Sequence, residues 1–291
     1  MTWKRVATAV VLVPVVVGLV LWGTTTFVTL AIALVTLLAL FEYFALGAAI
    51  GHRAYRFWTA TCSLLLAFVQ WQTVYVPAYH LPGGLTAYKT TQQFAGGSSP
   101  LETTFFLFVL GITALTLCTR RPLVEVLPAA GISTSGFLLV AFPLSFAIRL
   151  HGAGSQGPVL LLLALVIVWV SDTAAYFVGR SIGKHPLAPL LSPKKTWEGA
   201  IAGFLGSIAV ALAFRPWLNV PLAHLLGMAT VGNIAGQAGD LLESGYKRSA
   251  GVKDSGSVLP GHGGVLDRID ALILAIPVVW YYWVMIYSPG S

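Results

Sequence analysis

The sequence predicts an all-α, polytopic integral membrane protein with about nine transmembrane helices. Three observations predict this fold class: the composition, the spacing of the apolar runs, and the distribution of basic residues along the chain. Hydrophobic residues make up 57% of the 291 residues, charged residues make up only 9%, and the mean hydropathy is +0.82. Because so little polar side chain cannot cover a water-facing surface, lipid is expected to be the main solvent of the chain.

Nine apolar runs are long enough, or nearly so, to cross a hydrocarbon core, which requires about 20 helical residues. They lie at 6–22, 26–50, 57–78, 103–118, 130–149, 158–178, 197–214, 220–239 and 267–287. The fourth and seventh runs are short, and we expect them to be tilted or half-buried helices. No small-residue cleavage pattern follows the first run, so we interpret it as a retained helix and not as a signal peptide.

Basic residues are distributed unevenly between the loops, and cytoplasmic loops collect Lys and Arg. If the N-terminus is cytoplasmic, fourteen of the 17 Lys and Arg residues lie in inner segments, and only Lys89, Arg149 and Arg215 lie in outer ones. This asymmetry predicts that the charge-rich loops 179–196 and 240–266 are cytoplasmic. The net charge of +7 comes without a basic helix or an aromatic RNA-binding signature, which favours anionic lipid or phosphate over nucleic acid as the partner.

Carboxylates gather near the end of the chain. Asp267 and Asp270 lie three residues apart at the start of the last helix, so their side chains are expected to share one face. The segment "GDLLES" places Asp240 and Glu243 at the end of the preceding apolar run. Carboxylates at lipid depth are costly unless they are paired or bind a metal, so this grouping predicts a hard divalent cation, with Mg²⁺ as the natural candidate. The alternative is that the acidic pair only favours the positive end of a helix.

Basic residues accompany these carboxylates. Lys247, Arg248 and Lys253 are expected in the connecting loop, where they would hold phosphate groups beside glycines that let backbone amides approach. Alternatively, they only enforce topology and contact lipid headgroups.

A second polar island has the same chemistry. Asp172 lies about two turns inside the sixth run, and Lys194 and Lys195 precede a helix that begins near Thr196. Glu198 does not have the spacing of a capping box, so it is expected only to favour the positive end of that helix.

The stretch "SGYKRSAGVKDSGSVLPGHGGVLDRID", at 244–270, resembles the signature of phosphatidate cytidylyltransferases, also called CDP-diacylglycerol synthases, at nearly every specified position. The segments "SDTAAYFVGRSIGK" and "SPKKTWEG" resemble the upstream conserved block of that family, and "GDLLES" resembles its metal-binding segment. The similarity covers about 165–287. We therefore divide the chain into N-terminal transmembrane helices of unassigned role, 1–150, and a C-terminal transmembrane catalytic region, 151–291.

The resemblance implies a nucleotidyltransferase that converts phosphatidate and CTP into CDP-diacylglycerol and pyrophosphate, with Mg²⁺ as cofactor. It implies the catalytic residues Asp240, Lys253, Asp267 and Asp270. The metal ligands would be Asp240, Asp267 and Asp270, with Asp172 as a further ligand or a supporting group. The phosphates would be held by Lys194, Lys195, Lys247, Arg248, His262 and Arg268.

We expect an enzyme of the plasma (inner) membrane of a bacterium, and the distribution of Lys and Arg predicts that its active site is on the cytoplasmic side. Its partners would be CTP, phosphatidate and membrane lipid but no nucleic acid, and a homodimer is left open. Two other functions stay open. A CTP-dependent polyprenol or lipid kinase would use similar cations but transfer the γ-phosphate. An anion or lipid transporter would also carry polar islands in helices broken by glycine.

Overall fold

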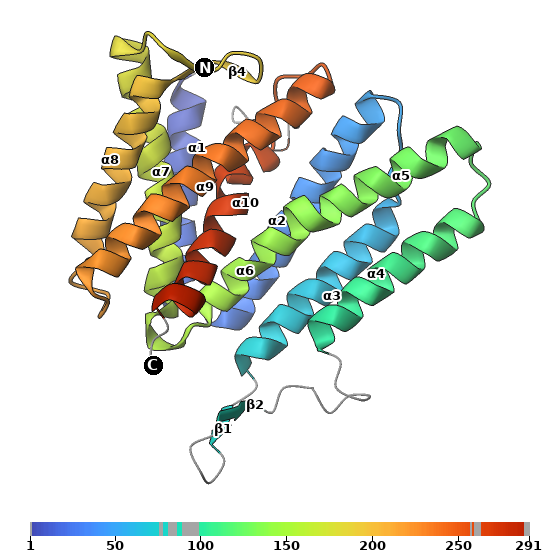
Figure 1. Cartoon of the computed structure of the whole chain (residues 1–291), viewed down its shortest axis with the longest axis horizontal. Coiled ribbons are helices and arrows are strands. Elements are labelled where there is room, and N and C mark those ends of the chain that lie inside the picture. The colour runs from blue at the N-terminus through green and yellow to red at the C-terminus, as the bar shows by residue number, and fades with distance from the viewer. Residues whose placement is uncertain are drawn as a thin grey trace.

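The computed structural model describes residues 2–75, 78–80, 86–88, 99–256, 258 and 263–287, and helices dominate them (Figure 1). The α-helices are α1 (Thr2–Trp22), α2 (Thr25–Ala49), α3 (Arg56–Tyr75), α4 (Pro100–Leu117), α5 (Leu123–Gly136), α6 (Phe142–His151), α7 (Gly157–Ile182), α8 (Trp197–Phe214), α9 (Leu222–Ser249) and α10 (Leu266–Tyr281). Short helical segments are η2 (Phe137–Ala141), η3 (Gly154–Gln156) and η4 (Tyr282–Tyr287). The predicted all-α class is confirmed.

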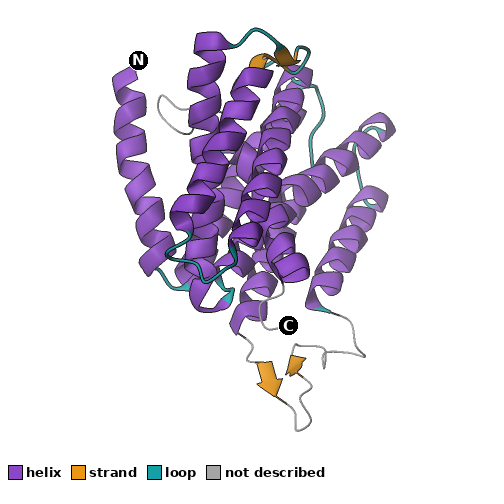
Figure 2. Cartoon of the chain, turned by 60° about the vertical axis from the view of Figure 1, so that its left-hand side comes forward, coloured by secondary structure: helices purple, strands orange, loops and turns teal. Residues whose placement is uncertain are grey.

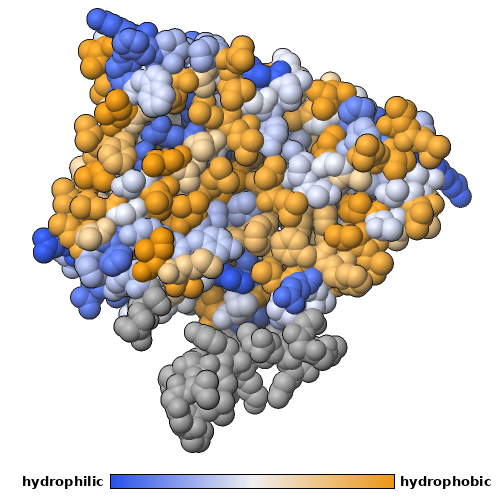
Figure 3. Space-filling model, in the orientation of Figure 1, coloured by the Kyte–Doolittle hydropathy of each residue, from blue (hydrophilic) through white to orange (hydrophobic). Residues whose placement is uncertain are grey.

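Six helical segments in the described part of the chain are long and apolar enough to cross a membrane. They are Thr25–Ala49, Pro100–Leu117, Leu123–His151, Gly154–Ile182, Trp197–Phe214 and Leu266–Tyr287, and Val10–Trp22 is a shorter apolar helix. Apolar side chains, drawn in orange, cover much of the face that Figure 3 shows. These features agree with a polytopic membrane protein. The predicted count of nine transmembrane helices stays a prediction, since α3 and α9 are not among the six.

The helices pack around two apolar cores that α10 joins. One core combines α7, α8 and α9 with α6, and it includes Ala275 and Ile276 of α10. The other combines α2, α3, α4 and α6, and it includes Leu266 and Ile273 of α10. Because α10 contributes to both cores, its N-terminal end lies where the two groups of helices meet (Figure 1).

Three segments differ from the sequence prediction. The helix expected at 130–149 begins earlier, at Leu123, and continues through η2 into α6. The helix expected to end near 240 continues to Ser249, so Lys247 and Arg248 lie in the last turn of α9 and not in a loop. An ion pair between Glu243 and Lys247, one turn apart, supports this polar extension beyond the apolar run. The segment 179–196 is no simple loop either, because α7 continues to Ile182 and residues 186–196 form a hairpin.

That hairpin consists of β3 (Pro186–Ala188) and β4 (Ser192–Thr196), which are antiparallel. A second antiparallel pair, β1 (Ala78–His80) and β2 (Thr86–Tyr88), lies at the opposite end of the bundle (Figures 1 and 2). The hairpin β3–β4 and the C-terminal end of α9 lie at one end of the molecule (Figure 1). The two charge-rich segments therefore lie on one side, and which side is cytoplasmic stays a prediction.

Candidate active site

The site begins where α9 and α10 cross. A Cβ atom at Gly239 would lie only 2.5 Å from the carbonyl oxygen of Asp270, so the two backbones nearly touch at this point. Only glycine permits so close an approach. Asp240 follows Gly239 directly and is thereby brought beside α10. The carboxylate of Asp270 interacts electrostatically with those of Asp240, Glu243 and Asp172.

The hairpin brings a cation to these carboxylates. Thr196 caps α8 by accepting a hydrogen bond from the amide of Gly199 at 3.2 Å, which confirms the predicted start of that helix. Strand β4 packs against α9, and Lys195 forms an ion pair with Asp240. Asp172 of α7 interacts electrostatically with Asp240 and Lys195. Residues that the sequence placed in two separate islands therefore form one cluster.

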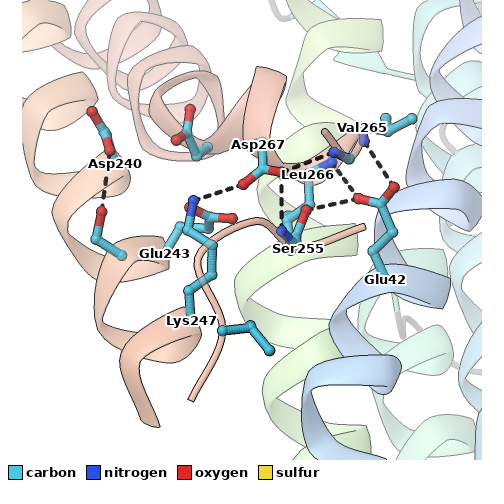
Figure 4. A network of polar contacts seen from close by, with 12 residues as sticks. Glu42, Asp240, Glu243, Lys247, Ser255, Val265, Leu266 and Asp267 are labelled. Carbon is cyan, nitrogen blue, oxygen red and sulfur yellow. Dashed lines mark hydrogen bonds and ion pairs between the residues drawn. The ribbon is translucent and has the colours of Figure 1, made fainter. Parts of the chain in front are cut away.

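A second cation lies between two other carboxylates (Figure 4). Lys247 pairs with Glu243 and, at 2.7 Å, with Oδ1 of Asp267. Little of either carboxylate side chain is exposed, 4% for Glu243 and 6% for Asp267. Oδ2 of Asp267 accepts hydrogen bonds from the amides of Ser255 at 3.0 Å and Gly264 at 2.8 Å. Asp267 thus anchors Lys247 and the loop between α9 and α10, which we call the signature loop. Asp270 instead interacts with the carboxylates of α7 and α9.

The clustered carboxylates are candidate ligands for a hard divalent cation. No group of three or more His, Cys, Asp or Glu side chains converges as a metal-binding set in the ranges that the structure describes. The chemistry nevertheless fits, since the clustered donors are carboxylate oxygens, which Mg²⁺ prefers. Oε1 of Glu243 is buried and has no hydrogen-bond partner, and an unsatisfied buried acceptor is costly. Lys195 and Lys247 now neutralise part of this negative charge.

The remaining predicted residues lie around this cluster. Lys194 and Lys253 are exposed. Lys194 lies in β4 next to Lys195, and Lys253 lies in the connection that follows α9. Arg248 is exposed and donates a hydrogen bond to the carbonyl of Val252 at 3.4 Å, so it helps to close the end of α9. Arg268 is exposed and interacts electrostatically with Asp172. His262 lies outside the described residues.

Sequence reasoning missed Glu42, because it is a lone acidic residue in an apolar run. Glu42 of α2 is only 2% exposed, and its carboxylate accepts hydrogen bonds from the amides of Val265 at 2.9 Å and Leu266 at 2.8 Å. It also accepts one from the hydroxyl of Ser255 at 2.9 Å (Figure 4). A Cβ atom at Gly264 would lie 2.2 Å from the Glu42 carboxylate, so this glycine makes room for it. Glu42 therefore fastens the signature loop and the start of α10 to α2.

A buried amide network beneath the carboxylates was missed as well. Asn233 donates hydrogen bonds to the hydroxyls of Ser171 at 2.6 Å and Ser207 at 2.9 Å. Gln237 donates to Asn233 Oδ1 at 2.8 Å and to the carbonyl of Ala200 at 3.2 Å. The network joins α7, α8 and α9 directly below Asp240. A sequence signal existed, since polar residues at 233, 237 and 240 follow helical spacing on one face.

Comparison with known proteins identifies the family to which the chain belongs. The model of the cytidylyltransferase family matches residues 3–286. The chain belongs to the cytidylyltransferase family. It is similar to the phosphatidate cytidylyltransferases of Staphylococcus aureus (strain COL), at 47% identity over 127 residues, and of Staphylococcus saprophyticus, at 45% over 132 residues. These matches cover 43% and 45% of this chain and 49% and 51% of those relatives.

The family resemblance inferred from the signature at 244–270 is thereby confirmed. The chain spans about half the length of the curated relatives it matches. Those relatives are bacterial, and together with the apolar helices they indicate a membrane protein of a bacterium.

Proposed function

We propose that this cytidylyltransferase-family protein transfers the cytidylyl group of CTP to phosphatidate, giving CDP-diacylglycerol and pyrophosphate. One observation supports this most: the α9–α10 crossing gathers carboxylates and the ammonium groups of Lys195 and Lys247 at one end of a membrane bundle. The two substrates, a lipid phosphate and a nucleoside triphosphate, would meet at such a boundary between lipid and water. Matches to proteins named phosphatidate cytidylyltransferase point to the same substrates.

The reaction joins two anions and requires no protein nucleophile. An oxygen of the phosphatidate phosphate forms a bond to the α-phosphorus of CTP, and the bond from that phosphorus to the bridging oxygen breaks. Pyrophosphate leaves with the electron pair. Because the attacking phosphate is already largely ionised at neutral pH, no general base is needed. The protein must therefore orient the phosphates in line and offset their mutual repulsion.

The cations of the cluster would orient the phosphates and offset their repulsion. Lys195 and Lys247 are held by carboxylates and project their ammonium groups into the site, where they would contact the triphosphate. Arg268 and the exposed Lys194 and Lys253 would contact phosphate groups from the rim. Asp240 and Asp270, with Asp172 and Glu243 nearby, would hold Mg²⁺, which would neutralise phosphate charge when bound. Asp267 would keep Lys247 and the signature loop in position.

The expected location follows from the charge distribution. Both charge-rich segments lie at one end of the bundle, and CTP is a cytosolic solute, so we place the site on the cytoplasmic face of the inner membrane. Phosphatidate would then enter the site laterally from the surrounding membrane lipid.

A label-transfer assay tests the proposal. Purified protein in detergent is mixed with phosphatidate, Mg²⁺ and CTP that is labelled on either the α- or the γ-phosphate. We expect only the α-label to enter the lipid fraction, and chelation of Mg²⁺ to abolish the transfer. Entry of the γ-label alone would establish lipid kinase activity, and no transfer of either label by correctly folded protein would refute both enzymatic functions.

A further inference from the structure

A groove lies away from the carboxylate cluster, between the start of α3, the end of α2 and the end of α4. It encloses about 720 Å³ and is lined mainly by apolar side chains. Phe57, which is 92% exposed, and Leu115 form part of its wall. Trp58 forms another part and is held in place, since its indole nitrogen donates a hydrogen bond to the carbonyl of Phe108 at 3.1 Å. An apolar groove of this size has room for part of an acyl chain.

Three guanidinium groups border the groove: Arg53, Arg56 and Arg121. Arg121 lies over the ring of Tyr55, 4.8 Å from its centre, and donates to the carbonyl of Arg53. Arg56 donates to the carbonyl of Phe44 at 3.4 Å. Within the described ranges, none of the three forms an ion pair with a carboxylate. Their positive charge is therefore available for an anion, and arginine suits phosphate in particular.

Tyr55 supplies an independent observation. It lines the groove and is only 8% exposed, yet its buried hydroxyl has no hydrogen-bond partner. A buried Tyr hydroxyl ordinarily finds a partner, because leaving it without one costs free energy. A ligand oxygen would supply that partner once the side chains that cover the hydroxyl move aside.

We propose that this groove binds an anionic glycerophospholipid. Its phosphate would lie among Arg53, Arg56 and Arg121, the Tyr55 hydroxyl would donate to one of its polar oxygens, and an acyl chain would extend along Trp58. The apolar wall favours a lipid over free phosphate, and the three cations favour an anionic lipid over a zwitterionic one. Enforcing topology requires basic residues only in the loop, and it explains neither their position around an apolar groove nor the unpartnered hydroxyl. The site is distinct from the cluster at α9 and α10, and the proposal does not rest on the proposed activity.

Fluorescence quenching tests the site because Trp58 forms its wall. Phosphatidylglycerol or phosphatidylcholine with dibrominated acyl chains is titrated into the full-length protein in mixed micelles. The contribution of Trp58 is the difference between the wild-type protein and Trp58→Phe. We expect phosphatidylglycerol to quench it at about one tenth of the lipid fraction that phosphatidylcholine requires. We expect Arg53→Gln/Arg56→Gln to raise that fraction about ten-fold and Tyr55→Phe to raise it a few-fold.

The variants are chosen to preserve the fold. Arg121 is left unchanged because it holds the backbone of Arg53 and the ring of Tyr55. Arg120→Gln is the matched control, since Arg120 is an exposed neighbour that does not line the groove. Each lipid should quench Trp58 in this variant as it does in the wild type. Equal quenching by both lipids, or full reversal by inorganic phosphate, would overturn the proposal. It would also be overturned if neither lipid quenched Trp58, and a particle mass of two chains would then indicate that a second copy covers the groove.

Discussion

Replacing Glu42 by Gln should loosen the signature loop without adding volume. The carboxylate accepts three hydrogen bonds, from Ser255, Val265 and Leu266, and it also lies at the positive end of α10. In Gln, one of the two oxygens becomes an NH₂ group that faces N–H or O–H donors. Hydrogen bonds to a charged group contribute about 1.5–3 kcal/mol each, so losing at least one of them and placing donor against donor should cost about 3 kcal/mol.

This cost should appear in catalysis as well as in stability. Each 1.4 kcal/mol corresponds to a factor of ten, so a loop that is 3 kcal/mol less firmly anchored should slow turnover by up to about 100-fold. Transfer of α-labelled CTP measures the rate, and amide exchange at Val265 and Leu266 reports the anchoring directly. We expect exchange at these two amides to accelerate in Glu42→Gln.

Ser133→Ala is the matched control. The Ser133 hydroxyl is fully buried in the same half of the chain and accepts a hydrogen bond from the amide of Tyr55 at 2.8 Å, just before α3. It should lower the unfolding temperature while turnover per folded molecule stays near normal. Our reasoning about Glu42 would be refuted if Glu42→Gln kept the wild-type rate and amide exchange, or if Ser133→Ala slowed turnover equally.

Three further predictions concern the crossing, the buried ion pair and the orientation. Gly239→Ala would push a methyl group against the carbonyl of Asp270, so it should cost about 1–3 kcal/mol in unfolding free energy and reduce turnover. Asp267→Asn breaks a buried ion pair and should cost about 3–5 kcal/mol in unfolding free energy, together with a rate loss on the order of 100-fold, whereas the exposed Asp254→Asn should be mild. Cysteine at the exposed Ser249, in a background without the two native cysteines, should react with an impermeant thiol reagent only after the inner face is opened.

Each of these predictions has a contrary result. Wild-type stability of Gly239→Ala would show that α9 and α10 do not touch there. A loss of only about 1 kcal/mol and a normal rate for Asp267→Asn would reduce its role to a favourable charge at a helix start. Labelling at position 249 from outside intact cells would show that the orientation is the reverse of the predicted one, and cytosolic CTP could then not reach the site.

Local patterns determined the class and the family of this protein. Apolar runs and scarce charge predict membrane helices because each run must satisfy its own backbone in lipid, and this requirement is visible in a contiguous stretch of sequence. The signature at 244–270 is contiguous as well, so it indicated the family. Helix ends were less predictable: α9 extends to Ser249 through the Glu243–Lys247 ion pair, which hydropathy does not register.

Only the tertiary structure decided which charges meet. Asp267 and Asp270 lie one turn apart, and the sequence assigned them to one face and one metal site. In the fold, Asp267 holds Lys247 and the loop, whereas Asp270 interacts with Asp240 across the Gly239 crossing. Glu42 reaches Ser255 and Leu266 over sequence separations of 213 and 224 residues. A buried carboxylate requires partners, but no local pattern names them, because they come from whichever backbone the packing of α2 against α10 brings within hydrogen-bond distance.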